Sequence, residues 1–98
     1  MTVRKIILHS LRGYRPALDA LVETWIQEGV KYVGVVGVDA SKVEDIISEL
    51  CVGDGSGGTE PYFMMTAFHQ PDETVEDAIA LAEQISDEYG TGTTVVEL

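Results

Sequence analysis

The sequence predicts a three-layer α/β/α sandwich around a four-stranded, mostly parallel sheet. The first observation is the valine-rich run at residues 32–38, which lacks the polar alternation of a strand that meets water on one side. The second observation is the order of the elements, β-α-β-α-β-α-β, in which each pair of consecutive strands is separated by a helical pattern. Helical crossovers of this kind imply parallel strands and right-handed connections.

The first half of the chain predicts two strands and two helices. A strand over 4–10 has an Ile6-Ile7-Leu8 centre, and a helix follows Pro16 and stops at Gly29, where a left-handed C-terminal residue is expected. Its apolar stripe has helical spacing and comprises Leu18, Leu21, Val22, Trp25 and Ile26. A second strand covers 31–38.

The second helix is predicted to begin at a capping box. Ser41-Lys42-Val43-Glu44 has the serine and glutamate spacing that lets each side chain bond the other residue's backbone N–H. The helix ends near Cys51, which we expect to be a small buried apolar residue rather than a reactive thiol.

The second half adds two strands and a helix. The third strand is expected over 61–69, and its nearly continuous apolar character favours a central place in the sheet. Thr74-Val75-Glu76-Asp77 is a second candidate cap, opening a helix that runs to Tyr89 and ends at Gly90. The last strand covers 93–98, and Glu97 indicates an exposed edge position.

Two strand orders fit this pattern. The order 2-1-3-4 is favoured because it centres the first and third strands, whereas 3-2-1-4 centres the first and second. Residues 1–98 form a single domain, since no internal repeat or long linker divides them.

The charge is strongly acidic and unevenly distributed. The net charge is -11, with all six bases and four acids in residues 1–42 and the other thirteen acids in residues 43–98. Such a field repels phosphate backbones, so no nucleic-acid partner is expected. The acidic charge is better explained by solubility or by attraction to a basic protein partner.

Other classes are disfavoured by features that the sequence lacks. No apolar run approaches the roughly 20 residues of a membrane span, and Ile6-Ile7-Leu8 is too short for a secretory signal. The single cysteine excludes an internal disulfide and suits a cytoplasmic location. Neither a metal site nor a cofactor is expected, because there is no metal-spaced His/Cys cluster and no P-loop. The glycine run at 53–58 follows a helix and precedes a strand, so it predicts a connector and not a nucleotide fingerprint.

Polar side chains gather after the strands, where ligands bind in open parallel sheets. The candidate ligand-binding residues are His9, Ser10, Arg12, Arg15, Asp39 and His69. The arginines are suited to a phosphate or carboxylate, and an imidazole is suited to general acid–base work. Structural roles compete with each of these: Asp39 as a helix cap, the arginines in surface ion pairs, and the histidines in loop hydrogen bonds.

The alternation of strands and helices is similar to that of response-regulator receiver domains and other flavodoxin-like or Rossmann-like modules. A receiver has an acidic pair after its first strand and a phosphate-accepting aspartate at the end of its third. Here those places hold His9-Ser10 and residues 66–69. The resemblance therefore implies the architecture and not the activity.

Two functions remain in view. The first is a small acidic cytoplasmic interaction or regulatory module, which forms a homodimer through its last strand or docks on a basic protein. The alternative is a domain that binds a small phosphate or carboxylate anion at the carboxyl edge, conceivably as a hydrolase or transferase. Enzymatic activity is left open, because no nucleophile is flanked by an identifiable base.

Overall fold

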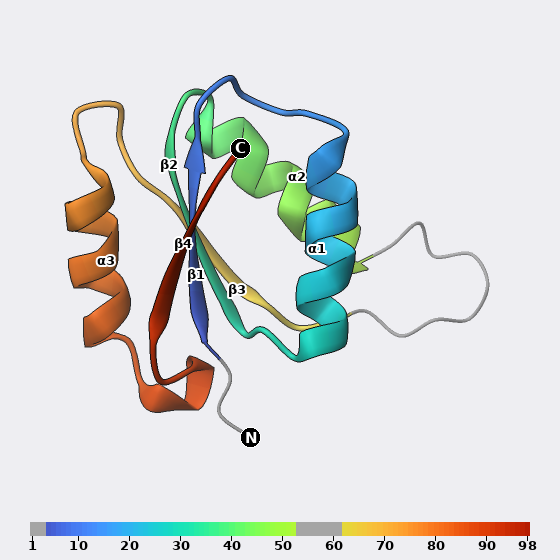
Figure 1. Ribbon diagram of the computed structural model, residues 1–98, viewed down its shortest axis with the longest axis vertical. Coiled ribbons are helices and arrows are strands. Elements are labelled where there is room, and N and C mark those ends of the chain that lie inside the picture. The colour runs from blue at the N-terminus through green and yellow to red at the C-terminus, as the bar shows by residue number, and fades with distance from the viewer. Residues whose placement is uncertain (1–3, 53–61) are drawn as a thin grey trace.

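The computed structural model describes residues 4–52 and 62–98 and shows a four-stranded, all-parallel sheet between helices. The predicted α/β fold class is confirmed. The elements in chain order are β1 (Lys5–Ser10), α1 (Ala17–Glu28), β2 (Tyr32–Gly37), α2 (Ala40–Val52), β3 (Met65–Phe68), α3 (Val75–Gln84), the 3₁₀ turn η1 (Asp87–Tyr89) and β4 (Thr93–Glu97). Helices α1 and α2 lie on one face and α3 on the other (Figure 1).

The strand order is 3-2-1-4, so the favoured order 2-1-3-4 is wrong and the second alternative is correct. The steps from β1 to β2 and from β2 to β3 go in one direction and place α1 and α2 on one face. The return from β3 to β4 crosses β2 and β1 with α3 on the opposite face. Because this connection reverses both its direction across the sheet and the face that it covers, all the crossovers have the same handedness, as the handedness rule requires.

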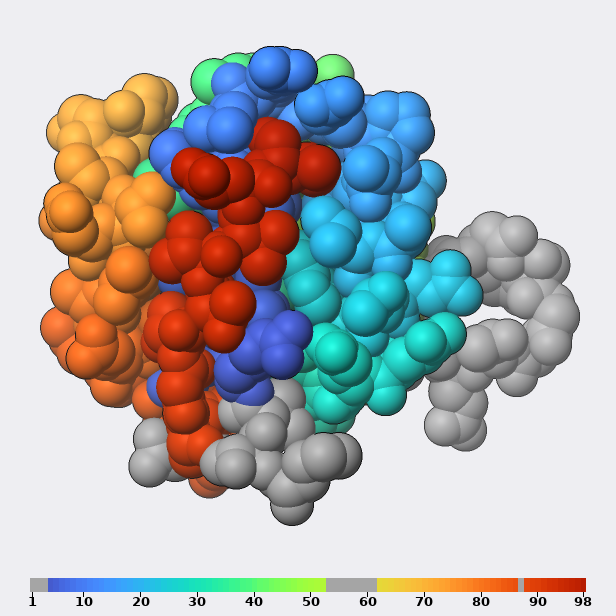
Figure 2. Space-filling model, in the orientation of Figure 1, coloured from blue at the N-terminus to red at the C-terminus, as the bar shows by residue number. Residues whose placement is uncertain are grey.

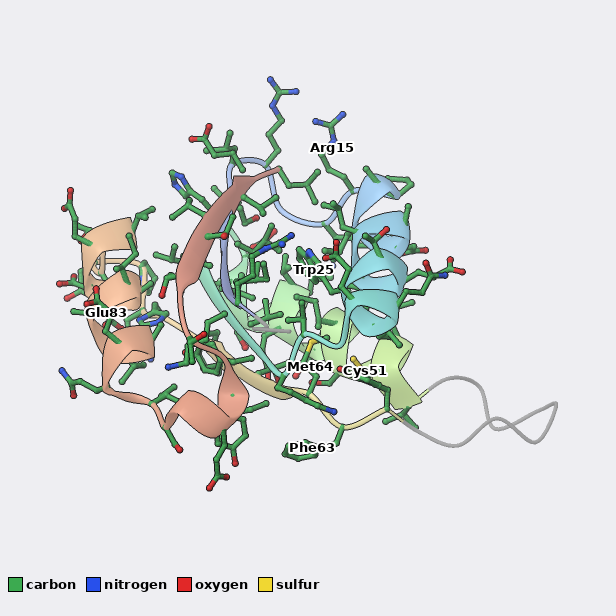
Figure 3. All side chains as sticks on the ribbon, turned by 60° about the horizontal axis from the view of Figure 1, so that its bottom comes forward. Arg15, Trp25, Cys51, Phe63, Met64 and Glu83 are labelled. Carbon is green, nitrogen blue, oxygen red and sulfur yellow. The ribbon has the colours of Figure 1, made fainter. Side chains whose placement is uncertain are left out.

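The sheet divides the core into two clusters. Ile6 and Leu8 of β1 face the α1/α2 side, where Trp25 fills the space between α1 and the sheet (Figure 3). Ile7 and Val36 face α3 and pack on its alanines. Both faces of β1 and β2 are thus covered, which explains why these strands have no polar alternation.

β3 is an edge strand and not the central strand that its apolar sequence predicted. It is confined to Met65–Phe68, and Phe68 is exposed. The predicted start of this strand at residue 61 lies outside the described residues, as does the whole 53–58 glycine run that was predicted to be a connector. β4 occupies the opposite edge, as Glu97 indicated.

Helix ends were partly predictable. Gly29 ends α1 in the left-handed conformation with φ 82°, and Thr74 forms the predicted capping box with Asp77. The capping box predicted at Ser41 is wrong, because α2 already begins at Ala40 and the Val43 N–H bonds the carbonyl of Asp39. Asp39 itself lies outside the helix, at φ 52°.

Candidate functional site

The carboxyl ends of β2 and β3 are where the connections diverge to opposite faces. The loop after β2 leads to α2, whereas the loop after β3 leads to α3 (Figure 1). Asp39 and His69 are the two candidate residues that follow these strands. Ligands of open parallel sheets bind outside the carboxyl ends where the strand order reverses, which in the order 3-2-1-4 is between β1 and β4, beside His9 and Ser10.

The β1 and β2 ends are closely packed on the α1/α2 side. The backbone of Gly13 donates to Ser10 Oγ at 3.1 Å, and Ser10 is buried. A Cβ atom on Gly13 would lie 2.9 Å from Asp39 Oδ2, so the carboxylate rests directly against the glycine. Gly37 passes so close to the Ser10 carbonyl that a Cβ atom there would overlap it. Glycine at 13 and 37 therefore allows the chain segments to approach closely at this edge of the sheet.

Asp39 has a backbone conformation that few residues adopt. Its φ of 52° is in the left-handed region, where aspartate is tolerated better than most residues because its short polar side chain can bond locally. The side chain is exposed, and the residue turns the chain from β2 into α2. It acts as the corner of this connection rather than as the side-chain cap that was the structural alternative.

The two histidines lie on the other side of the sheet. Val36 is paired with His9 and belongs to the cluster that packs on α3, and alternation along β1 places His9 on the same face as Ile7. His9 Nδ1 lies 3.6 Å from Glu97 Oε2 of β4, and both side chains are partly exposed.

His69 is buried and joined to the turn that precedes α3. Its Nδ1 lies 3.1 Å from Glu73 Oε2, while the other carboxylate oxygen of Glu73 accepts from the Gln70 backbone N–H at 2.7 Å. The backbone bond, and next the His69 bond, lower the pKa of the Glu73 carboxyl. Within residues 4–52 and 62–98, His69 Nε2 and the Tyr32 hydroxyl are the buried side-chain atoms without a hydrogen-bond partner.

The sheet thus separates the predicted site residues. Ser10 and Asp39 lie toward α1 and α2, His9 and His69 lie on the α3 side, and Arg12 and Arg15 are exposed. Figure 3 shows Arg15 pointing outward beyond the start of α1. The sheet therefore lies between two groups of these residues, and their role in ligand binding stays a prediction.

Reactive chemistry at Cys51 is disfavoured by its surroundings. Burial raises the pKa of the thiol, and Sγ lies 4.0 Å from Met64 Sδ beside a cavity of about 290 Å³. A thiol in this environment stays protonated and is a poor nucleophile. Figure 3 shows Cys51 and Met64 close together between α2 and the sheet.

One group that sequence reasoning missed is the buried ammonium of Lys5. Its Nζ donates to the carbonyls of Ala82 at 2.7 Å and Ile85 at 2.6 Å, at the C-terminal end of α3. Lys5 stands directly before the Ile6-Ile7-Leu8 run, and a lysine at the start of a central strand was the available signal.

Two kinds of feature are absent from the described residues. None of their helices is both long and apolar enough to cross a membrane. No group of three or more His, Cys, Asp or Glu side chains is arranged there to hold a metal ion.

These features define a small α/β/α domain with one buried lysine, two open sheet edges and no recognisable catalytic constellation in its described part. The family model described as "Domain of unknown function (DUF7684)" matches residues 7–96, which run from β1 into β4. The chain belongs to this family. No curated protein and no solved structure matches it.

Proposed function

We propose that this domain is a non-enzymatic interaction module that self-associates through the open edge of β4. The observation that carries the proposal is the unpaired backbone of this strand. Among the described residues, β4 has a hydrogen-bonded neighbour on one side only, which is β1. Figure 2 shows β4 as a continuous red band on the surface between α3 and α1.

The direction of the backbone groups follows from two hydrogen bonds. The Lys5 N–H donates to the carbonyl of Gly92, and the Leu98 N–H donates to that of His9. Backbone groups alternate in direction along a strand, so 92, 94, 96 and 98 face β1. Thr93, Val95 and Glu97 therefore direct their N–H and C=O groups toward the open edge.

These outward groups are self-complementary. A second copy that pairs antiparallel with Val95 opposite its own counterpart brings Thr93 opposite Glu97 on both sides. Each of these pairs exchanges both of its N–H···O bonds. No two glutamates are directly opposite in this register, and the two Val95 side chains, each 40% exposed, cover one another.

The strand also lacks the usual protection against pairing. Its sequence, TTVVE, has β-branched residues at four of five positions and contains no proline and no lysine. The other edge strand, β3, is shorter, at four residues. β4 is therefore the edge at which a second copy adds most favourably.

The test is the oligomeric state of Val95→Lys, measured by sedimentation equilibrium over a wide concentration range. Lysines directly opposite one another repel, and the valine contact is lost, so the dimer should weaken at least about tenfold. Val95→Thr is the matched control, because it keeps a β-branched residue and should still dimerise.

A mixture of Val95→Lys with Val95→Glu adds a direct test of the register. Lysine opposite glutamate at the twofold position should restore association that neither variant shows alone. A wild-type protein that stays monomeric at millimolar concentration would refute self-association. Wild-type dimers that persist unchanged in Val95→Lys would refute the β4 edge as the interface.

A further inference from the structure

A cavity of about 530 Å³ opens at the amino edge of the sheet, on the α3 side. It lies at the opposite end of the strands from Asp39 and His69. Its lining comprises Lys5, Ile79, Glu83, Gly90, Thr91, Gly92 and Thr93. Small-molecule sites commonly have volumes of roughly 300–1,000 Å³, so this cavity has the size of a metabolite site.

Lys5 supplies a fixed positive charge to this cavity. The residue is 3% exposed, and the carbonyls of Ala82 and Ile85 hold its ammonium in place. The Ala82 carbonyl belongs to the last turn of α3, and Ile85 is the residue that follows the helix. An ammonium has three N–H donors, so one more donor remains for an acceptor in the cavity.

Glu83 supplies a negative charge on the same wall. It lies on α3, across the sheet from Trp25 (Figure 3). No ion pair joins Lys5 to Glu83, both of which belong to the described part of the chain. The two charges are therefore both presented to the cavity and do not neutralise each other in direct contact.

The other residues that line the cavity are uncharged, and part of the cavity is open. Thr91 and Thr93 add hydroxyl groups that donate and accept, and Ile79 adds an apolar surface. A Cβ atom on Gly92 would meet nothing within 4 Å, so the space in front of this glycine is open.

We propose that this cavity binds a small zwitterion of the α-amino acid type. The carboxylate accepts from Lys5 Nζ and the threonine hydroxyls, the ammonium donates to Glu83, and the apolar part lies on Ile79. A polyanion is disfavoured by Glu83 and by the net charge of -11, whereas a polyamine is disfavoured by Lys5. The pairing of opposite charges selects a ligand that carries both.

This site shares Thr93 with the proposed dimer interface, but the residues that test the two proposals are different. Val95 does not line the cavity, and Glu83 is on α3 and not on the β4 edge. Binding should therefore survive Val95→Lys, and dimerisation should survive Glu83→Gln.

The experiment titrates each of the standard amino acids, at up to about 10 mM, into the full-length protein and follows its backbone amide resonances. At least one amino acid should shift Gly90, Thr91 and Gly92 in a saturable way. Glu83→Gln should weaken that binding at least tenfold, while the matched control Glu88→Gln, an exposed acid outside the lining, should not change it.

Blocked ligands test each charge without altering the protein. The N-acetyl derivative loses the ammonium and the methyl ester loses the carboxylate, so both should bind at least tenfold more weakly than the parent amino acid. The proposal is overturned if no amino acid shifts these amides, if Glu83→Gln binds as tightly as the wild type, or if the blocked forms bind equally well.

Discussion

At the scale of single residues, Gly37 lies where two neighbouring strands approach too closely for a side chain. Its φ is 112°, and a Cβ atom there would overlap the Ser10 carbonyl of the neighbouring strand. Gly37→Ala should lower the free energy of unfolding by about 3 kcal/mol, because the left-handed backbone and the overlap each cost about 1–2 kcal/mol or more. Urea unfolding measures the loss.

Gly92→Ala is the control for the backbone part of this cost. Gly92 also has a positive φ, of 153°, but a Cβ atom there would meet no neighbour. The difference between the two variants isolates the overlap with Ser10. If both variants are destabilised equally, the close approach of β1 and β2 is not what requires glycine at 37.

The candidate site shows how far residue-level reasoning extends. The sequence placed His9, Asp39 and His69 at the carboxyl edge, and they lie there. It did not predict the face of the sheet on which each residue lies. That face depends on the register of strand pairing, and a shift of one residue would move every side chain to the opposite face. Lys5 was missed as a functional group, since its acceptors at 82 and 85 lie far along the chain and only the fold brings them near.

At the scale of elements, the Thr74 cap is a separable source of helix stability. The Thr74 hydroxyl accepts from the Asp77 backbone N–H, and the Asp77 carboxylate accepts from the Thr74 N–H. Thr74→Ala should lower the free energy of unfolding by about 1 kcal/mol, because it leaves a helix donor without its partner. Thermal and urea unfolding both report this change.

The same substitution inside α1 provides the control. The Thr24 hydroxyl bonds the carbonyl of Ala20 on an exposed helix face, where alanine has the higher helix propensity. Thr24→Ala should therefore be neutral or slightly stabilising. An equal loss in both variants would show that the hydroxyl contributes no capping at Thr74.

Element boundaries were predictable where the signal is local, and strand order was not. The Gly29 stop and the Thr74 cap depend on residues within a few positions of one another. The position of β3 in the sheet depends on which face of the sheet α3 crosses. The residues of β3 themselves do not encode this choice. Its apolar sequence was misleading because Phe63 and Phe68 are exposed and only part of the run pairs with β2.

At the scale of the whole molecule, the uneven charge opposes self-association. Antiparallel pairing at Val95 continues one sheet through both copies and keeps their α3 helices on the same side. α3 carries acids in its first turn, at Glu76 and Asp77, and has no base in its last turn. Each copy has a net charge of -11, so the copies repel one another while the backbone bonds and Val95 attract.

Salt should therefore tighten the dimer. Screening lengths fall from about 10 Å at 0.1 M to about 3 Å at 1 M ionic strength, which weakens repulsion between exposed acids on neighbouring helices. Raising sodium chloride from about 50 mM to about 500 mM should lower the dissociation constant several-fold in sedimentation equilibrium. Salt should stabilise the mixed Val95→Lys and Val95→Glu dimer less, because it also screens the attraction between the introduced lysine and glutamate. A dissociation constant that rises with salt in the wild type would instead mean that attraction between opposite charges holds the copies together, at a surface other than the β4 edge.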